Sequence, residues 1–318
     1  MADRDTFDLA GKRVWVAGHR GMVGAALTRR LNSEGCKLLE IARADVDLRE
    51  QAAVRAWLKR ERPDAVFVAA ATVGGIQANA TRPAEFLYDN LMIEANIIHA
   101  AHEVDVGKLL FLGSSCIYPR LADQPITEAA LLTGPLESTN EWYSIAKIAG
   151  IKLAQAYRRQ HGRHFISAMP TNLYGPNDNF DLASSHVLPA LIRKMHEAKV
   201  ARAPSVVLWG TGTPRREFLH VDDLADALVH LMKTYDAEGH VNVGVGEDVS
   251  IKELAMICAR VVGYEGRFEH DTSKPDGTPR KLLDVSLLTS LGWRASIPLE
   301  AGIAATYRWF LEQSSVRA

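Results

Sequence analysis

A tyrosine and a lysine in the middle of the chain have the types and the spacing needed to pass a proton to a carbonyl oxygen. Tyr143 and Lys147 stand four residues apart in a stretch, 136–160, whose apolar residues recur at helical spacing. Residues at that spacing share one face of a helix, so the lysine ammonium would favour the phenolate and lower the tyrosine pKa from about 10. The alternative is a solvent-exposed helix face, which so short a motif does not exclude by itself.

Ser114 supplies a third group for the same reaction. It follows a mostly apolar run, 108–112, that is typical of a buried strand. At the carboxyl end of a strand, a serine hydroxyl can orient and polarise a substrate carbonyl. Tyr143 would then pass the proton and Lys147 would hold the cofactor ribose, while hydride moves between a nicotinamide and the carbonyl carbon.

Three glycines indicate where such a cofactor would bind. Gly18, Gly21 and Gly24 have the spacing Gly-x-x-Gly-x-x-Gly, between a predicted strand, 13–17, and a predicted helix, 22–34. Glycine permits a tight turn and a close approach of the backbone to a pyrophosphate, which the N-terminus of the helix stabilises. Because both the strand and the helix are predicted, we favour a dinucleotide site over a plain turn with helix-packing glycines.

The end of the second predicted strand, 37–41, bears on the choice between NAD and NADP. NAD-binding proteins usually place an acid there for the ribose 2′-hydroxyl, whereas NADP-binding proteins place an arginine nearby. Glu40 is such an acid, but we place it inside the strand and so too early for the ribose. Arg43 in the next loop and Arg20 in the glycine turn could grip a 2′-phosphate, or both could simply face solvent. We therefore predict NADP(H).

Alternating strands and helices would bring these residues to one edge of a sheet. Further strands are predicted at 65–70, 108–112 and 164–168, with helices at 48–61, 83–104 and around Tyr143. This order predicts an α/β fold with a doubly wound parallel sheet of Rossmann type, in which ligands bind beyond the carboxyl ends of the strands.

The second half of the chain is expected to interleave with that sheet. A predicted strand at 241–244 would return to it, while helices at 250–262 and 299–310 would lie elsewhere. Ser250 and Glu253 have the spacing of a capping box at the start of the first of these helices. We expect an NADP-binding domain of residues 1–170 with a returning segment at about 215–248, and a smaller, discontinuous α/β substrate domain of residues 171–214 and 249–318.

Composition and charge argue against several classes of protein. The chain has 318 residues and a net charge of -1, so no overall basic field favours nucleic acid. No apolar run approaches the roughly 18 residues that span a membrane, and the polar N-terminus lacks the features of a signal peptide. The three cysteines are far apart and have no metal-binding spacing, so we expect neither a disulfide framework nor a metal site. The cytoplasm is the expected compartment.

Taken in order, the glycine turn, Ser-x-x-x-Tyr at 114–118 and Tyr-x-x-x-Lys resemble the motifs of the extended short-chain dehydrogenase/reductase family over most of the chain. Segments 17–24, 112–119, 170–176 and 274–281 are similar to members that act on a GDP-linked sugar. Those members epimerise C3 and C5 of GDP-4-keto-6-deoxy-D-mannose and reduce C4 with NADPH. The resemblance therefore implies a GDP-sugar substrate, NADP(H) and, because family members commonly pair through two long helices, a homodimer.

The resemblance also implies roles that spacing alone does not assign. Besides the three glycines, the two arginines and the Ser-Tyr-Lys group, it adds to the cofactor site Met22, Val23, Leu112, Gly113, Pro170, Asn172, Leu173 and His186. For the substrate it implies Ser114, Cys116, Asn172, Lys194, Trp209, Arg216 and Asp276. Without the resemblance, the basic residues would be ordinary surface charges and Trp209 a core residue.

Epimerisation beside a ketone requires a second acid–base pair, because a proton is removed next to the carbonyl and another is returned on the opposite face. Cys116 lies two residues after Ser114, and His186 opens a predicted helix. A thiol and an imidazole both titrate in a useful range. Alone, however, they would be interpreted as a buried inert cysteine and as a capping or surface histidine. The resemblance favours the catalytic role for both and leaves His196, His220 and His230 as structural residues.

Two rival functions remain open. The nearer rival is another nucleotide-sugar enzyme. A 4,6-dehydratase would want an Asp-Glu pair where Ser115 and Cys116 stand, and a 4-epimerase would show no net use of NADPH. The second rival is a non-catalytic NADP-sensing protein, which would need none of the proposed catalytic residues.

Overall fold

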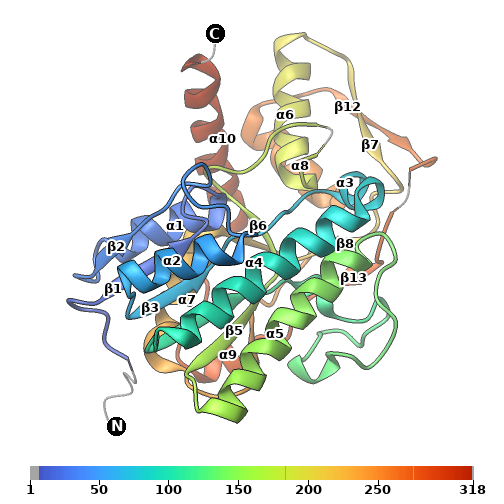
Figure 1. The fold of residues 1–318 in the computed structure, drawn as a ribbon. Coiled ribbons are helices and arrows are strands. Elements are labelled where there is room, and N and C mark those ends of the chain that lie inside the picture. Colours follow the sequence, from blue (N-terminus) through green and yellow to red (C-terminus); the bar gives the residue numbers. More distant parts are fainter. Residues whose placement is uncertain (1–6, 183, 275, 317–318) are drawn as a thin grey trace.

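A parallel sheet forms the centre of the molecule, as the alternating pattern predicted (Figure 1). Its strands are β1 Arg13–Ala17, β2 Lys37–Leu39, β3 Ala65–Val68, β4 Lys108–Leu112, β5 Phe165–Pro170 and β10 His240–Val243. They lie in the order β10-β5-β4-β3-β1-β2, and each neighbouring pair is parallel. The strand expected to return near 241–244 is therefore present as β10, beside β5.

This computed structural model describes residues 7–182, 184–274 and 276–316. The polar N-terminus considered for a signal peptide falls mostly on residues 1–6, and Pro275 belongs to the 274–281 segment; both lie outside the described residues. Within the described part of the chain, no helix is long and apolar enough to cross a membrane.

Helices cover both faces of the sheet, because successive side chains of a buried strand point to opposite sides. Val14 and Val16 of β1 pack with α1 (Met22–Leu31) and α7 (Val221–Thr234), whereas Trp15 packs with α2 (Gln51–Glu61). On the same face as α2, α4 (Pro83–Glu103) and α5 (Glu141–His161) lie side by side (Figure 1). This layering leaves the carboxyl ends of the strands open to ligands at one edge.

A smaller part of the molecule lies to one side of the sheet (Figure 1) and has its own core. Leu188, Leu254 and Ile303 in that core come from α6 (Val187–Val200), α8 (Ile251–Val262) and α10 (Leu299–Val316). The predicted capping box of Ser250 and Glu253 is present at the start of α8. The paired strands are β6 Asn172–Tyr174 with β9 Phe218–His220, β7 Ser205–Trp209 with β12 Arg267–Asp271, and β8 Arg215–Arg216 with β11 Val249–Ser250 and β13 Arg280–Lys281.

Some predicted bounds are wrong. β2 ends at Leu39, so Glu40 lies just beyond the strand and not inside it. The reason is that β2 is an edge strand that pairs with β1 alone, and the chain leaves the ladder early. The sequence also did not predict the short helices α3 (Ile76–Thr81) and α9 (Ser286–Ser290) or the 3₁₀ turns η1 (Ser115–Ile117) and η2 (Glu128–Ala130).

Candidate active site

The glycine turn packs so closely that no side chain fits at Gly18 or Gly24. Gly18 follows β1 with φ +87°, and an added Cβ would lie 2.8 Å from the backbone of Ala70. A Cβ on Gly24 would lie 2.0 Å from the carbonyl oxygen of Gly18. Gly21 precedes α1, whose first turn carries no acid. A bare turn leading into a helix N-terminus fits the pyrophosphate of a dinucleotide.

The other residues expected to hold the cofactor lie mainly along the same sheet edge. Met22 and Val23 begin α1, Leu112 and Pro170 end β4 and β5, and Gly113 follows Leu112. Leu173, in β6, packs against the core of the sheet. Arg20 in the glycine turn and Arg43 after β2 are both exposed.

Ser114, Tyr143 and His186 line one cavity, which is open to solvent and has about 280 Å³ of empty space. Ser114 stands two residues beyond β4, Tyr143 lies in the first turn of α5, and His186 directly precedes α6. The edge of the Phe86 ring meets the Tyr143 ring, with 6.4 Å between the ring centres. Three groups that are far apart in sequence are thus brought to one cavity.

Burial, and not Lys147, dominates the acidity of Tyr143. Burial raises the pKa of Tyr143 well above its usual value, and Cys116 and Glu94 raise it further. The predicted lowering is therefore wrong for the protein without ligands. The Lys147 ammonium lies 5.8 Å from the centre of the Tyr143 ring and donates to the carbonyl of Leu112 at 3.1 Å. A phenol that stays protonated at neutral pH is suited to donate a proton.

A buried carboxyl lies behind Lys147. Glu94 of α4 is 2% exposed, and Gly150 of α5 is packed so closely that a Cβ there would lie 2.9 Å from the Glu94 carboxyl carbon. Burial raises the pKa of Glu94 to about 8, although the charge of Lys147 acts to lower it. Burial in turn lowers the pKa of Lys147. The close packing of α4 against α5 thus influences the protonation of both Glu94 and Lys147.

Glu94→Gln is expected to stabilise the protein increasingly as the pH rises from 5 to 8. With a pKa of about 8 in the folded state, Glu94 keeps a proton that the unfolded chain loses near pH 4.5. The folded state binds more protons in this window, so stability falls as the pH rises through it. Glutamine cannot ionise and escapes that loss. Melting temperatures of both proteins, measured at each pH unit, check the trend.

Glu103→Gln, on the same helix, is the matched control. Hydrogen bonds from Arg55 lower the pKa of Glu103, so this carboxyl contributes stability above its unfolded pKa. Its replacement should lower the melting temperature at neutral pH. A difference between Glu94→Gln and wild type that stays constant from pH 5 to 8 would contradict the assignment of a raised pKa to Glu94.

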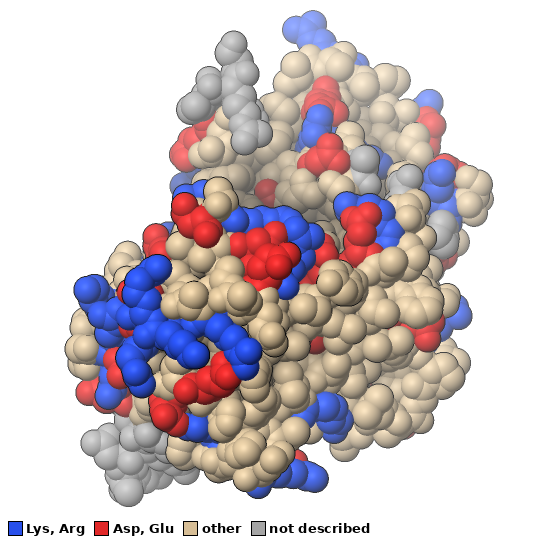
Figure 2. Space-filling view, viewed as in Figure 1, with Lys and Arg blue, Asp and Glu red and all other residues tan. Residues whose placement is uncertain are grey.

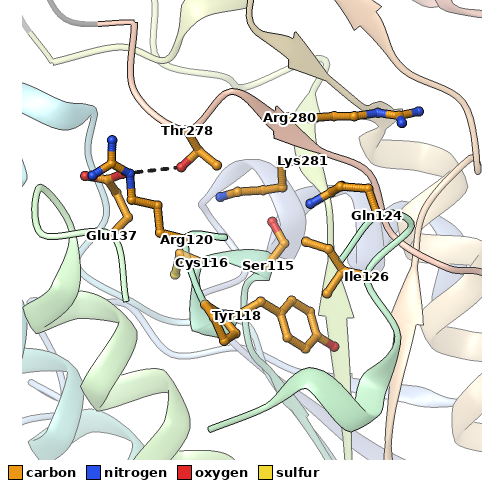
Figure 3. Close-up of a pocket in the computed structure, with 11 residues that line it drawn as sticks. Ser115, Cys116, Tyr118, Arg120, Gln124, Ile126, Glu137, Thr278, Arg280 and Lys281 are labelled. Carbon is orange, nitrogen blue, oxygen red and sulfur yellow. Dashed lines mark hydrogen bonds and ion pairs between the residues drawn. The ribbon is translucent and has the colours of Figure 1, made fainter. Parts of the chain in front are cut away.

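Cys116 lines a second cavity, which is also open to solvent. It lies in η1, two residues after Ser114, whose Oγ accepts a hydrogen bond from the Cys116 N–H at 3.5 Å. Figure 3 shows the Lys281 side chain reaching into this cavity above Cys116. Lys281 interacts electrostatically with Cys116, and its charge also acts on His186. Lys281 therefore acts electrostatically on both Cys116 and His186, the two groups expected to move protons at C3 and C5.

The sequence did not assign Lys281, Arg120 or Glu137 to the site. The Arg120 guanidinium lies 3.2 Å from Glu137, and Thr278 donates to the same carboxylate at 3.4 Å (Figure 3). These three side chains and that of Thr278 line the cavity of Cys116. Lys281 closes the 274–281 segment and Arg120 directly follows the 112–119 segment, so their places in those segments were the available signal.

The pKa of His186 lies below its usual value. Its side chain makes no capping hydrogen bond with α6, so the ring is left for the cavity. Desolvation, with the positive charge of Lys281 in addition, lowers the pKa of His186. In the neutral form one ring nitrogen donates a hydrogen bond and the other accepts one.

The residues expected to hold the nucleotide end of the substrate lie in the smaller part of the molecule. Trp209, at the end of β7, is 51% exposed. The ammonium groups of Lys194 and Lys274 lie 5.3 and 5.4 Å from its ring centre. An aromatic plate with two cations beside it offers a surface for a base and a diphosphate.

Three further substrate residues are engaged with the protein itself. Asp276 accepts hydrogen bonds from the backbone and hydroxyl of Thr211 at 2.8 and 2.9 Å. Arg216 donates to the carbonyl of Arg215 at 2.8 Å, and Asn172 donates to the carbonyl of Glu217 at 2.8 Å. Neither cavity, as far as its described lining goes, includes these residues, Lys194 or Trp209. Figure 2 shows the surface hollowed between the part that carries α6 and α8 and the part that carries α4.

A sheet edge that can hold a dinucleotide, facing a protonated phenol, defines an enzyme class that handles carbonyl groups with a nicotinamide cofactor. Residues 14–244 match the NAD dependent epimerase/dehydratase family, and the chain belongs to that family.

Several relatives are similar to the chain over nearly its full length. A GDP-L-fucose synthase of Sinorhizobium fredii is 59% identical over 303 residues, which are 95% of this chain and 96% of the relative. The GDP-L-fucose synthase of Escherichia coli is 58% identical over 314 residues, with 96% and 98% covered. A solved GDP-L-fucose synthetase from Naegleria fowleri, bound to NADP, has a TM-score of 0.91 and 30% identity, and the match covers 99% of this chain and 97% of that one.

Proposed function

We propose that the chain converts GDP-4-keto-6-deoxy-D-mannose to GDP-L-fucose with NADPH, by 3,5-epimerisation followed by reduction of the 4-keto group. The observation that carries the proposal is the meeting of two proton-transfer systems. Ser114 and Tyr143 line one cavity, and Cys116 lines the next cavity, two residues along from Ser114. Full-length similarity to proteins named GDP-L-fucose synthase supports the same substrate.

NADPH would lie along the carboxyl ends of the strands. Its pyrophosphate fits the turn at Gly18 and Gly24, where any Cβ would collide with backbone. Arg20 and Arg43 are exposed and suit the 2′-phosphate. Lys147 would hold the nicotinamide ribose. When bound, the cofactor supplies the hydride for C4.

Epimerisation would combine Cys116 from one cavity with three groups that line the other. The Cys116 thiolate would remove a proton from the carbon next to C4. Ser114 and Tyr143 would donate hydrogen bonds to the C4 oxygen, where negative charge develops. His186, in its protonated form, would return a proton on the opposite face. Proton exchange with solvent would then restore the thiolate and the imidazolium, and the same groups would act on the other carbon that flanks the ketone.

Reduction would use Tyr143 as the acid. Burial raises the pKa of Tyr143, so its phenol still carries the proton at neutral pH. That proton passes to the C4 oxygen as hydride reaches C4, while Ser114 keeps the oxygen in place. Tyr143 would thus steady the enolate in one step and donate the proton in the other.

The nucleotide end of the substrate would lie against the smaller part of the molecule. The exposed ring of Trp209 would stack on guanine, and the nearby Lys194 would meet the diphosphate. Asp276 and Arg216 influence each other electrostatically and would border the same surface. Asn172, at the start of β6, would lie between the nucleotide and the sugar.

We infer the following organisation on the same basis. Residues 1–170 with about 215–248 would form the NADP-binding domain, and residues 171–214 with 249–318 would form the substrate domain.

The chain would act in the cytoplasm as a homodimer that joins through α4 and α5, where the apolar side chains of Tyr88, Trp142 and Ile145 are exposed. Sedimentation of the purified protein at the mass of one copy would contradict the dimer.

The proposed function can be tested by adding NADPH and GDP-4-keto-6-deoxy-D-mannose to the protein in deuterated water. We expect NADPH oxidation and, by NMR of the product, deuterium at C3 and C5. Oxidation without deuterium would leave a simple ketoreductase, and exchange without net oxidation would favour an epimerase. Binding of NADPH with neither reaction would favour a sensing protein.

A further inference from the structure

A short segment that the sequence did not assign to the site lies along the cavity of Tyr143. It runs from residue 73 to residue 81 and contains α3. Gly74 and Asn79 from this segment line the cavity. A Cβ on Gly74 would lie 2.9 Å from a side chain of α3, so the turn into the helix has no spare room. The segment therefore brings the polar side chain of Asn79 to the wall of the cavity.

The amide nitrogen of Asn79 is engaged within the protein. Nδ2 donates to the carbonyl oxygen of Gly74 at 2.8 Å and to that of Gly75 at 3.1 Å. These two bonds use both amide hydrogens and fix which end of the amide is nitrogen, because an oxygen in its place could not donate. Oδ1 is therefore an acceptor whose orientation is set by the fold.

Oδ1 of Asn79 has no partner of its own. It is buried and accepts no hydrogen bond from the part of the chain that the structure describes, and Asn79 as a whole is 6% exposed. A buried polar atom without a partner costs free energy, so native proteins keep few of them. An acceptor of this kind at a cavity wall is suited to a hydrogen-bond donor that enters the cavity.

The same segment is joined to the loop that precedes His186. The Gly75 N–H donates to the carbonyl oxygen of Ser184 at 3.0 Å, and a Cβ on Gly75 would lie 2.8 Å from the carbonyl oxygen of Ser185. Because Asn79 holds the Gly75 carbonyl, its amide is linked through Gly75 to this loop. Asn79 and His186 therefore line the cavity from two segments that are fixed to each other.

We propose that Oδ1 of Asn79 accepts a hydrogen bond from the C3 hydroxyl of the sugar, and that Asn79 thereby selects substrates that carry this hydroxyl. The inference rests on the proposed function, in which Ser114 and Tyr143 hold the C4 oxygen in the same cavity. Of the two carbons beside C4, C3 carries a hydroxyl and C5 carries a methyl group. The C3 hydroxyl is therefore the sugar donor nearest to the held oxygen. A site that accepts from a hydroxyl disfavours a ligand without it, because the acceptor then stays unpaired.

Calorimetry of the protein loaded with NADP⁺ tests the proposal, with GDP-4-keto-6-deoxy-D-mannose and with an analogue that lacks the C3 hydroxyl. The oxidised cofactor supplies no hydride, so binding is measured without reduction. Wild type should bind the analogue about tenfold more weakly than the substrate. Asn79→Ala should bind the two with nearly equal Kd values, and its Kd for GDP should match that of wild type. Equal Kd values in wild type would overturn the proposal without any variant, as would a tenfold preference that persists in Asn79→Ala.

Asn96→Ala is the matched control. Asn96 is a buried asparagine of α4 whose Nδ2 donates to the carbonyl oxygen of Leu48 at 3.0 Å, and it belongs to neither cavity as far as their described linings go. This variant should keep the wild-type preference, although its melting temperature should fall because a buried hydrogen bond is lost. If it loses the preference as Asn79→Ala does, general loosening is responsible and the proposal fails.

Two further outcomes separate this inference from the proposed function. Weaker binding of NADP⁺ by Asn79→Ala, with the tenfold preference intact, would assign Oδ1 to the cofactor and overturn the inference alone. If wild type, folded and loaded with NADP⁺, binds neither sugar nucleotide, the substrate assignment in the proposed function fails and the inference fails with it.

Discussion

Tyr143→Phe is expected to slow NADPH oxidation by GDP-4-keto-6-deoxy-D-mannose about 10³-fold, within the range for a lost general acid. The variant removes the one hydroxyl that would give the C4 oxygen its proton, and little else changes because the ring remains packed against Phe86. Ser114 still donates to the C4 oxygen, so exchange at C3 and C5 should continue, though more slowly. Steady-state oxidation rates and NMR of the recovered sugar in deuterated water measure both steps.

Tyr157→Phe is the matched control for this prediction. Tyr157 lies in the same helix, and its hydroxyl meets Nδ1 of His99 at 2.5 Å, outside both cavities in the part of the chain that the structure describes. The Tyr157→Phe variant should oxidise NADPH with the sugar substrate at close to the wild-type rate. If Tyr143→Phe lost exchange as completely as reduction, Ser114 would not hold the enolate as we propose.

Cys116→Ser should abolish deuterium exchange at C3 and C5, with a loss of at least about 10²-fold. A serine hydroxyl keeps its proton at neutral pH, so it cannot replace a thiolate as the base, even beside Lys281. The reductase groups are untouched, and slow NADPH oxidation should persist without deuterium in the product. NMR of the sugar after incubation with NADPH in deuterated water distinguishes the two reactions.

Cys36→Ser provides a thiol-to-hydroxyl change away from the cavities. Cys36 lies before β2, and its thiol donates to the carbonyl of Leu31 at 3.5 Å. Deuterium exchange at C3 and C5 should be unaffected in Cys36→Ser. Exchange at the wild-type rate in Cys116→Ser would show that another group removes the proton, and His186 would be the next candidate.

The sheet could be predicted because its strands are buried on both faces. β3 is apolar throughout, β4 and β5 are buried along their whole length with one polar residue each, and glycines and helices separate the three clearly. The end of β2 was not predictable in the same way. Glu40 follows a short strand at the sheet edge, where only the partner strand decides how far the ladder continues.

The catalytic residues could be located from motifs, but their electrostatics could not. The spacing of Tyr143 and Lys147 predicts that they share a helix face, which holds, yet the pKa of Tyr143 depends on burial and on Glu94 from another helix. Lys281 reaches Cys116 because β13 pairs with β8, a contact between segments far apart in the chain. Neither effect has a local signature in the sequence.

The position of β10 has a consequence for synthesis of the chain. β5 ends at Pro170, and the strand that covers its outer edge begins only at His240. At about 5–20 residues per second, a ribosome needs roughly 4–14 s to add the intervening segment. During that time the nascent chain presents an apolar strand with unpaired backbone groups, which invites association with other chains. The sheet is therefore complete only when β10 has been made, and we expect a chain truncated before β10 to aggregate.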